Sequence, residues 1–433
     1  MKVYSFPRGG LSFEDPTVPS KDSSEVAFLP VLSVIPMVQE SGGRAYPVVS
    51  SGETVREGML IGRTCGPGAA NVHATVPGKV YRPTSWKKSD GHAVDALIIR
   101  MEGSFDRLGR REEVFPWNSM SCYEIQRIIA EYGVVEMEGR GQPVSEMISA
   151  FRNAREPLVL VVRCVFDDPW LVADYVLCKE RLKAVVEGSF IAAKSGGRVR
   201  RIIFAVSAGE KKLGEELIAE ASHGEIPCSM VLVGSRYPQH NHRELESALN
   251  SFCKKEGMEP PSMLILGPAT LAAVYDAIKY KKPALDRYIA VGGSAVRKPK
   301  VLKARIGTRL SEIFAECEGF FDIPRFIGTG SPLLGREVTD LNEPVVRTTY
   351  AVFAALKGQS GYESAKKCIS CGECRSVCPI GLDPEELYKQ AIRFNKARVA
   401  EECHGCGCCE VVCPSHLPLA GIIAEKPGEK RHG

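Results

Sequence analysis

Cys368-Ile-Ser-Cys371-Gly-Glu-Cys374-Arg-Ser-Val-Cys378-Pro379 and Cys403-His-Gly-Cys406-Gly-Cys-Cys409-Glu-Val-Val-Cys413-Pro414 repeat one cysteine spacing in the last third of the chain. Three thiolates two residues apart can wrap one corner of an iron–sulfur cube, while the N–H groups between them point at the sulfides. The proline turns the chain after the fourth cysteine, which can then reach a neighbouring cube. The two runs therefore predict a segment that folds around two metal clusters.

This spacing is that of a bacterial two-cluster ferredoxin, in which the fourth cysteine of each run binds the other cluster. We therefore predict two [4Fe-4S] ligand sets, one of Cys368, Cys371, Cys374 and Cys413 and one of Cys378, Cys403, Cys406 and Cys409. A structural zinc site and a disulfide knot are the alternatives, but two complete copies that end in Cys-Pro favour clusters. We expect the ninth cysteine, Cys408, to be a buried spare thiol. Two such clusters indicate transfer of single electrons, without naming the donor.

The composition is that of a chain with several ordinary domains. The chain has 433 residues, 44% of them hydrophobic, and a formal net charge of +4, which gives no electrostatic case for nucleic acid. Nine of the 16 cysteines lie in the two runs, and the others are scattered, which favours reduced thiols in the cytoplasm. We expect no signal peptide and no transmembrane helix, because no apolar run is long enough. Docking on a membrane-embedded partner remains open.

We predict a β domain over residues 1–115, with strands and Gly/Pro turns between residues 29 and 101. The stretches 47–62 and 71–80 follow the barrel-sandwich hybrid pattern of lipoyl and biotinyl carriers. A carrier needs an exposed lysine at the hairpin between these stretches, and none occurs between Arg63 and Gly78. We therefore expect a docking domain without a swinging arm, in which His73 is a packed turn residue.

The pattern then changes to alternating helices and strands, which predicts a doubly wound α/β domain over residues 116–283. Its expected strands are Leu158–Val162, Arg201–Val206, Met230–Val233 and Met263–Leu266, and its expected helices are Leu171–Lys194, Gly209–Ser222, His242–Lys254 and Ala269–Tyr280. For residues 284–360 we predict a β-grasp-like unit. Its expected parts are a basic turn at 297–300, a helix over 309–317, a Gly/Pro-rich loop at 325–335 and a strand near 349–356. A linker at 359–364 leads to a helical two-cluster ferredoxin domain over 361–425, with helices expected at 383–400, and residues 426–433 form a loose tail.

This order of units resembles the C subunit of the Rnf electron-transport complex over nearly the whole chain. The stretches that carry the resemblance are 8–10, 47–49, 71–74, 171–175, 291–296, 328–335 and 405–409. The resemblance implies a peripheral subunit on the cytoplasmic face of the inner membrane. It also implies other Rnf subunits and ferredoxin as partners, in a complex that moves electrons between NADH and ferredoxin and couples this to ion translocation. The α/β layer is similar to the flavoprotein subunit of respiratory complex I, which holds FMN and receives hydride from NADH.

One loop departs from that family. Where the family has a glycine-rich loop around flavin and nucleotide phosphates, this chain has Gly133-Val-Val-Glu136-Met-Glu138-Gly139-Arg-Gly141-Gln-Pro-Val144. The side chains of Glu136 and Glu138 block close backbone approach, and their charge repels a phosphate.

The second family element appears as residues 163–169, in which Asp168 only partly replaces a glutamate. Arg140 and Arg163 either compensate for the lost contacts or are ordinary surface arginines. We predict that FMN and NADH bind weakly or not at all, while the fold of the layer survives.

Three functions compete on this evidence. The first is an electron-transfer subunit of a membrane-bound, ion-translocating redox complex. The second is a soluble flavin-dependent NADH dehydrogenase with its own ferredoxin domain, and the altered loop argues against it. The third is a purely structural role for the clusters, for which two complete ligand sets are an expensive solution.

Overall fold

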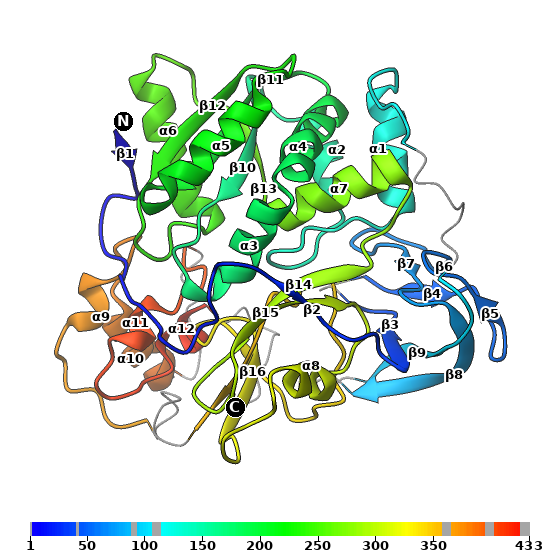
Figure 1. The fold of residues 1–433 in the computed structure, drawn as a ribbon. Coiled ribbons are helices and arrows are strands. Elements are labelled where there is room, and N and C mark those ends of the chain that lie inside the picture. The colour runs from blue at the N-terminus through cyan, green and yellow to red at the C-terminus, as the bar shows by residue number, and fades with distance from the viewer. Residues whose placement is uncertain are drawn as a thin grey trace.

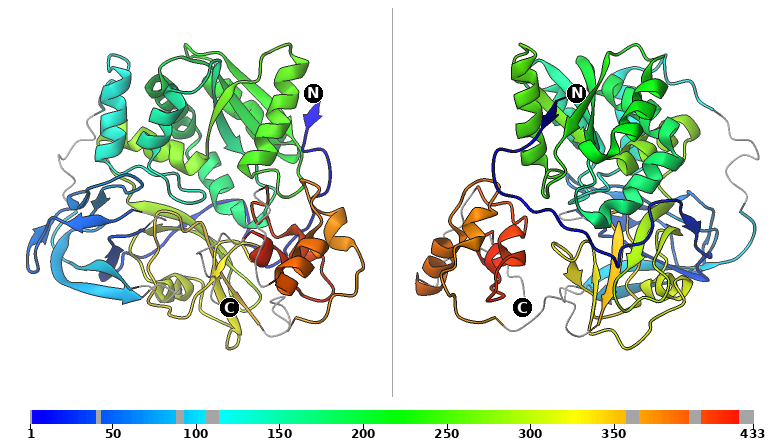
Figure 2. Two further views of the ribbon diagram at one scale, coloured as in Figure 1. Left: turned by 180° about the vertical axis from the view of Figure 1, so that it is seen from behind. Right: turned by 60° about the vertical axis from the view of Figure 1, so that its left-hand side comes forward.

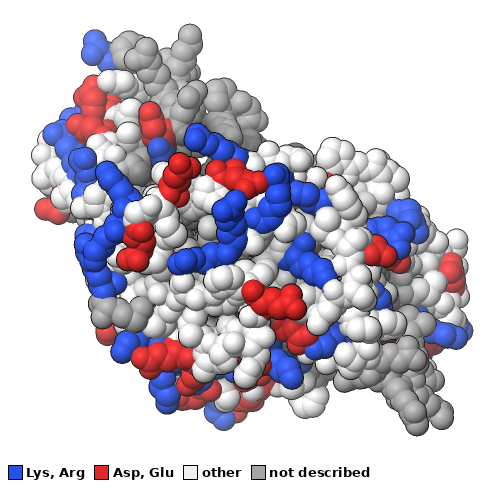
Figure 3. Space-filling model, turned by 90° about the horizontal axis from the view of Figure 1, so that it is seen from above, with Lys and Arg blue, Asp and Glu red and all other residues white. Residues whose placement is uncertain are grey.

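The computed structural model describes residues 2–39, 43–87, 93–105, 114–356, 365–394 and 402–424. The predicted linker at 359–364 and the tail at 426–433 lie outside these ranges, as do residues 395–400 of the helical stretch expected at 383–400. No helix within the ranges is long and apolar enough to span a membrane. Basic and acidic side chains lie interspersed on the face shown in Figure 3, in keeping with the near-neutral net charge.

The α/β domain is built on a parallel five-stranded sheet, which we call the central sheet, in the order β1-β12-β11-β10-β13. Its strands are β1 (Val3–Tyr4), β10 (Leu158–Cys164), β11 (Val199–Ser207), β12 (Cys228–Val233) and β13 (Ser262–Leu266). The apolar run of β10 has no polar side because helices cover both faces of the sheet (Figure 1). Leu158, Leu160 and Val162 pack into one core, and Val159 and Val161 into the other.

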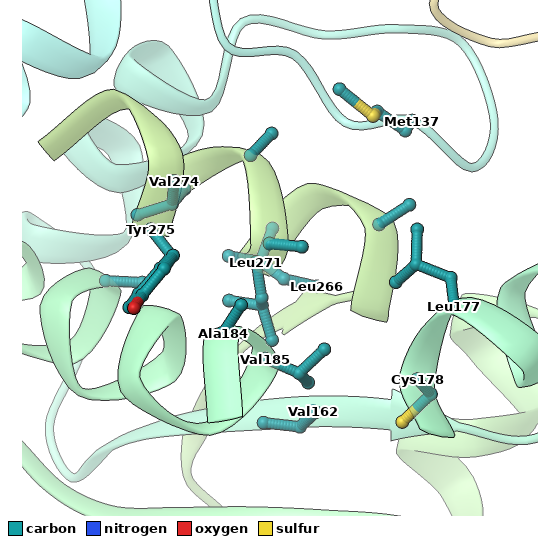
Figure 4. Close-up of a cluster of buried hydrophobic side chains, with 14 of the residues drawn as sticks. Met137, Val162, Leu177, Cys178, Ala184, Val185, Leu266, Leu271, Val274 and Tyr275 are labelled. Carbon is teal, nitrogen blue, oxygen red and sulfur yellow. The ribbon is translucent and has the colours of Figure 1, made fainter. Parts of the chain in front are cut away.

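Most helices lie on one face of this sheet. They are α1 (Cys122–Glu131), α2 (Val144–Arg152), α3 (Val172–Glu180), α4 (Leu182–Gly196), α5 (Lys211–Ala221) and α7 (Pro268–Tyr280), whereas α6 (His242–Lys255) covers the opposite face. Figure 4 shows Val162 of the sheet with side chains of α4 and α7 in the larger core. The predicted α/β strands and helices are therefore present, with one exception among the helices.

That exception is the single helix expected from Leu171 to Lys194, which is two helices. Arg181 leaves helical geometry, with φ −119° and ψ 31°, and separates α3 from α4. Its guanidinium binds the Asp276 carboxylate of α7 in a bidentate pair, with N–O distances of 2.9 and 2.7 Å. A tertiary ion pair, which has no local sequence signal, fixes the position of the break.

The N-terminal β domain consists of two small sheets over a common apolar core that includes Ile35, Ile61 and Leu97. One sheet has the order β3-β9-β8-β5 and the other β4-β6-β7. Their strands are β3 (Leu32–Pro36), β4 (Ala45–Pro47), β5 (Thr54–Val55), β6 (Leu60–Thr64), β7 (Val72–His73), β8 (Gly78–Lys87) and β9 (Ala93–Met101). His73 lies in β7 and not in the expected turn. Its ring stacks on Tyr132, and burial lowers its pKa to about 3, which fits a packed neutral side chain.

A mixed sheet in the order β17-β16-β18-β14-β15-β2 follows, with one helix, α8 (Leu310–Glu316). Its strands are β2 (Glu25–Val26), β14 (Asp286–Gly292), β15 (Lys300–Arg305), β16 (Phe326–Thr329), β17 (Arg336–Glu337) and β18 (Ala351–Ala355). The central strands β14 and β18 are parallel, and β15 and β16 flank them antiparallel. The stretch 325–335, expected to be a loop, thus contains a strand, because Phe326–Thr329 finds a partner in β18.

The first 28 residues differ from the expected domain of residues 1–115. β1 extends the central sheet through β12, and β2 extends the mixed sheet through β15. Between these strands the chain passes along the C-terminal segment as a strap (Figure 2). Such edge pairing involves only two residues per strand, which leaves no periodic sequence signal.

The C-terminal segment lies beside both the central sheet and the mixed sheet (Figures 1 and 2). It has four helices within the described ranges, α9 (Glu373–Ser376), α10 (Pro384–Phe394), α11 (Cys408–Val411) and α12 (Leu419–Ile423). Its small core contains Leu417, Leu419, Ile423 and cysteines of both runs. The cysteines therefore replace part of an ordinary hydrophobic core in this segment.

Candidate functional site

The eight cysteines predicted as ligands line two separate cavities, four at each, and Cys408 also lines the second of them. We call the first the outer site, lined by Cys368, Cys371, Cys374 and Cys413, and the second the inner site, lined by Cys378, Cys403, Cys406 and Cys409. Each cavity takes three of the eight from one run and the fourth from the other. These are the two sets that the sequence predicts for two cubes.

The backbone of the two runs folds in the same way. Gly372 and Gly407 each adopt φ +80° directly before the short helices α9 and α11, which carry the third cysteine of each run. Backbone N–H groups point at thiol sulfurs at both sites: Ser370 N lies 3.4 Å from Cys368 Sγ, and Leu382 N lies 3.2 Å from Cys378 Sγ. In iron–sulfur proteins, the sulfurs accept hydrogen bonds from backbone N–H groups of this kind.

The donor sets suit an iron–sulfur cube better than a single ion. Within the described ranges, no three His, Cys, Asp or Glu side chains come close enough together to hold one metal ion. In a [4Fe-4S] cube each thiolate binds its own iron, so that the four sulfurs stand further apart than the ligands of one zinc. Four thiols around a cavity with apolar walls fit the wider arrangement.

The two sites differ in their surroundings. At the outer site Cys371 is exposed, and the neighbouring Ile369 side chain is 67% exposed. At the inner site Cys378 and Cys409 are buried, and the loop of Cys406 packs against the α/β domain. Electron exchange with another protein is therefore sterically easier at the outer site.

Cys408 is fully buried, as predicted for a spare thiol, but it is not isolated. It lines the inner cavity together with Cys406, and hydrogen bonding from the Cys408 and His404 side chains lowers the pKa of Cys406 to about 5. A lower pKa favours the thiolate, which is the form that binds iron. Cys408 thus supports a predicted ligand, a role that its spacing alone does not reveal.

Residues far away in the sequence hold the inner site against the α/β domain. The Tyr237 hydroxyl donates to the Cys406 carbonyl oxygen at 2.5 Å, and Arg243 Nη1 donates to the Glu402 carbonyl oxygen at 2.6 Å. On the other side, the Gly10 N–H donates to the Val377 carbonyl oxygen at 2.9 Å. These contacts are not predictable from the cysteine motifs, because none of the three donor residues belongs to one.

The altered loop at 133–144 is filled by its own side chains. The Glu138 carboxylate forms a buried ion pair with Arg163 at the end of β10, with 3.1 Å between Arg163 Nε and Glu138 Oε2. The same carboxylate lies so close to Gly267, at the N-terminus of α7, that a Cβ there would overlap it. This is a position that a phosphate takes in nucleotide-binding sheets, and here a protein carboxylate takes it.

The other predicted residues of the loop 133–144 and of the stretch 163–169 make contacts within the fold. Gly133 has φ +62° and passes so close to the Asn71 carbonyl that no side chain fits. Burial raises the pKa of Glu136 to about 7, and Gly139 lies against its carboxylate. Asp168 caps a short 3₁₀ turn, η1 (Pro169–Leu171), by accepting from the Trp170 N–H at 3.0 Å.

Gly141 also belongs to the predicted site, and it has φ +71° in a buried position. The alternative of Arg163 as an ordinary surface arginine is wrong, since its side chain is only 12% exposed and pairs with Glu138. Arg140, in contrast, is exposed. The structure therefore does not bring the predicted loop residues together around an open site.

A separate hollow of about 1390 Å³ lies where the β domain, the α/β domain and the mixed sheet meet. Among the predicted loop residues only Met137 reaches it, while Glu136, Glu138 and Arg163 do not line it. This hollow is therefore distinct from the region around Glu136 and Glu138 of the altered loop.

Two family models match this chain. Residues 6–104 match the RnfC barrel sandwich hybrid domain, and residues 367–417 match a 4Fe-4S dicluster domain. These matches confirm the expected barrel-sandwich and ferredoxin-type domains. They define the class of the chain, a multidomain iron–sulfur protein.

Relatives of known name match most of the chain. The C subunit of the ion-translocating oxidoreductase complex of Rhodobacter capsulatus is 28% identical over 88% of this chain and 74% of its own length. The C subunit of the proton-translocating ferredoxin:NAD(+) oxidoreductase complex of Clostridium ljungdahlii is 26% identical, over 84% and 79%. Its counterpart in the Na(+)-translocating ferredoxin:NAD(+) oxidoreductase complex of Acetobacterium woodii is also 26% identical, over 82% and 80%. The resemblance to the C subunit of Rnf-type complexes is therefore confirmed.

Among solved structures, an NAD+-reducing [NiFe]-hydrogenase in the H2-reduced state matches with a TM-score of 0.45 and 14% identity, over 54% of this chain and 47% of that one.

Proposed function

We propose that this chain is a peripheral electron-transfer subunit of a membrane-bound, Rnf-type complex on the cytoplasmic face of the inner membrane. The complex couples electron transfer at the level of NADH and ferredoxin to ion translocation. The observation that carries the proposal is the pair of cysteine-lined cavities, each of which holds all four cysteines of one predicted ligand set, the fourth coming from the other run. Two [4Fe-4S] clusters bound there supply one-electron transfer, and the eight cysteines hold them.

The two sites have different tasks in this proposal. The outer site faces solvent through Cys371 and Ile369 and exchanges electrons with a partner, which is another protein of the complex or a ferredoxin-like carrier. The inner site is held against the α/β domain by Tyr237 and Arg243. In this proposal the more exposed outer site stands at the end of the electron path that faces the partner, and the more buried inner site stands further inside the chain.

The α/β layer and the β-grasp-like unit after it act as a scaffold similar to a flavoprotein. FMN and NADH bind weakly or not at all, because Glu138 occupies the N-terminus of α7 and Arg163 is already neutralised. A phosphate would have to displace a buried carboxylate and then leave it unpaired, which costs several kcal/mol. The domain limits of 116–283, 284–360 and 361–425 belong to the same proposal.

The test is anaerobic purification of the full chain, with iron, sulfide and flavin measured on one preparation. We expect about eight irons per chain, as two four-iron clusters require, and less than about a tenth of an equivalent of flavin. We also expect NADH to leave the visible spectrum unchanged while dithionite bleaches it. Stoichiometric FMN with bleaching by NADH would favour the alternative, a soluble flavin-dependent NADH dehydrogenase.

A second experiment tests the partners. Tagged chain is isolated from gently solubilised membranes, and co-purification of membrane-embedded subunits is expected. Recovery of the chain alone, fully loaded with iron, would contradict membership in a complex while leaving the clusters intact.

A further inference from the structure

The hollow between the β domain, the α/β domain and the mixed sheet has no part in the proposed function, and its volume of about 1390 Å³ is large. Ala269, Ala272 and Ala273 of α7 line it, at a spacing that places them on one face of the helix. Side chains of a single carbon leave open the space that larger residues would fill. Ligand pockets occur preferentially at such junctions of domains and measure roughly 300–1000 Å³, so that a ligand of considerable size fits here.

Aromatic rings surround this alanine floor. The rings that line the hollow are those of Phe115, Tyr132, Tyr275, Tyr280 and Tyr288. The Tyr132 ring is stacked on His73 with an interplanar angle of 9°. Tyr275 and Tyr280 pack edge to face, with 5.6 Å between their ring centres. Rings fixed by such contacts offer apolar surface to a flat group of a ligand.

The charge of the lining is strongly positive. Nine cationic side chains and five carboxylates line the hollow. Asp276 is neutralised by Arg181 in the bidentate pair described above. Glu57 and Asp286 both bind Arg305, with N–O distances of 2.6 and 3.3 Å. Three of the five carboxylates are thus engaged within the protein, and the other cations outnumber the two that remain.

Most of these cations have no counter-ion. Six of them form no ion pair with any residue that the structure describes, namely Arg56, Arg63, Arg127, Lys183, Lys281 and Lys303. The first four are exposed and the last two half-buried, so that they form a rim around the apolar floor. Lys281 Nζ lies 5.1 Å from the centre of the Phe115 ring, and Lys303 Nζ lies 6.0 Å from that of Tyr288. Unpaired cations beside an apolar wall of low dielectric attract anions.

We propose that this hollow binds a nucleotide that carries several phosphates, such as a nucleoside triphosphate. Its ring packs on the alanine floor among the aromatic side chains, and its phosphates meet the cationic rim. Several phosphates are required, because the unpaired cations exceed the charge of a single one. The site is separate from the cysteine cavities and from the altered loop, so this goes beyond the proposed function. FMN and NADH carry less negative charge than a triphosphate and still bind weakly.

The test is isothermal titration calorimetry of the anaerobically purified full chain with ATP. We expect one equivalent of ATP to bind, about tenfold or more tightly than AMP, FMN or NADH, because each added charge meets an unpaired cation. Arg127→Glu combined with Lys183→Glu reverses two exposed charges of the rim and should weaken ATP binding at least about tenfold. Lys212→Glu, on the exposed side of α5 and outside the hollow, is the matched control and should stay within about twofold of the unmutated chain.

Two further measurements locate the ligand. Ala273→Leu fills part of the floor without a change of charge, and it should also weaken ATP binding about tenfold. ATP should protect Lys183 and Lys281 from an amine-acylating reagent, as read by mass spectrometry, and leave Lys212 reactive.

The possible results separate this site from the clusters. Absence of ATP binding at about 1 mM would overturn the proposal, as would binding that neither the charge variant nor Ala273→Leu changes. Tighter binding of a glutamate-rich peptide than of ATP would assign the hollow to an acidic chain segment and overturn the nucleotide. Iron measured on the same preparation tests the proposed function separately, since a chain that binds ATP but holds no iron would contradict the clusters and not the hollow.

Discussion

At the scale of single residues, the altered loop shows how a ligand position can be closed from within. The Glu138 side chain is only 8% exposed, and burial is the main cause that raises its pKa, while Arg163 opposes this rise. The sequence indicates that two glutamates obstruct a phosphate. The structure adds that the Glu138 carboxylate lies against Gly267 at the N-terminus of α7 and is paired with Arg163.

Glu136, in the same loop, gives stability a dependence on pH. Burial raises the pKa of Glu136 from 4.5 to about 7, so the folded chain holds this proton more tightly than the unfolded chain. The contribution to stability is complete below pH 4.5 and is lost as the pH rises to 7, by about 3 kcal/mol at most. We expect the free energy of unfolding of Glu136→Gln, measured with a denaturant, to lack this loss between pH 5 and pH 7.5. Glu146→Gln changes a neighbour on α2 and is the control, and it should show the same loss as the unmutated chain.

The cysteines divide into ligands and one supporting thiol. We expect Cys374→Ala to remove the EPR signal of one cluster and about half of the iron, since Cys374 lines the outer site and not the inner one. Cys408→Ala should leave both signals, because the eight other thiols already complete two cubes. Iron loss in Cys408→Ala greater than in Cys374→Ala would reverse the assignment.

At the scale of elements, the N-terminal strap links the two halves of the molecule. Gly9 has φ +63°, and a Cβ on it would meet the carbonyl groups of Val377 and Cys378. Arg236 Nη1 donates to the Gly9 carbonyl oxygen at 2.6 Å and holds the strap from the other side. The strap therefore lies directly against the backbone of Cys378, the cysteine of the first run that lines the inner site.

Gly9→Ala tests this contact. The side chain adds both a clash and a strained backbone, for a cost of roughly 1–3 kcal/mol. Because Cys378 is displaced, we expect loss of the inner cluster signal before the outer one when iron is slowly removed by a chelator. Gly52→Ala also has a positive φ but open space around it, so it controls for the backbone term. Equal loss from both sites in Gly9→Ala would contradict a local effect.

At the scale of the whole molecule, Arg347 joins three units. It lies just before β18 of the mixed sheet, and its Nη1 donates to the Asn71 carbonyl oxygen of the β domain at 3.0 Å and to the Gly133 carbonyl oxygen of the α/β domain at 2.7 Å. The side chain is only 5% exposed. Charged donors to buried carbonyls make the junction specific as well as stable.

Arg347→Met keeps most of the side-chain volume and removes these donors. We expect a loss of about 3 kcal/mol and, in calorimetry, separation of one unfolding transition into two as the β domain uncouples. Arg325→Met, on the same mixed sheet, is the matched control. A single unshifted transition in Arg347→Met would show that other contacts hold the units together.

The sequence by itself determined the grouping of eight cysteines into two sets of four, the barrel-sandwich domain and the alternation of the α/β layer. These features depend on short spacings and on periodic burial, which residues close in the chain impose on one another. The break at Arg181, the strand Phe326–Thr329 and the pairing of β1 and β2 were not predictable in this way. Each depends on a partner from a distant part of the chain.

The tertiary structure alone decided how the two cysteine runs of identical spacing become different. Tyr237 lies 169 positions from Cys406, and Glu244 meets His404 only because α6 begins beside the inner site. Burial and hydrogen bonding to a sulfur are set by whatever surrounds it in space, and the spacing of cysteines carries no information about those neighbours. The sequence therefore indicates two clusters, and the packing of the α/β domain distinguishes the inner from the outer one.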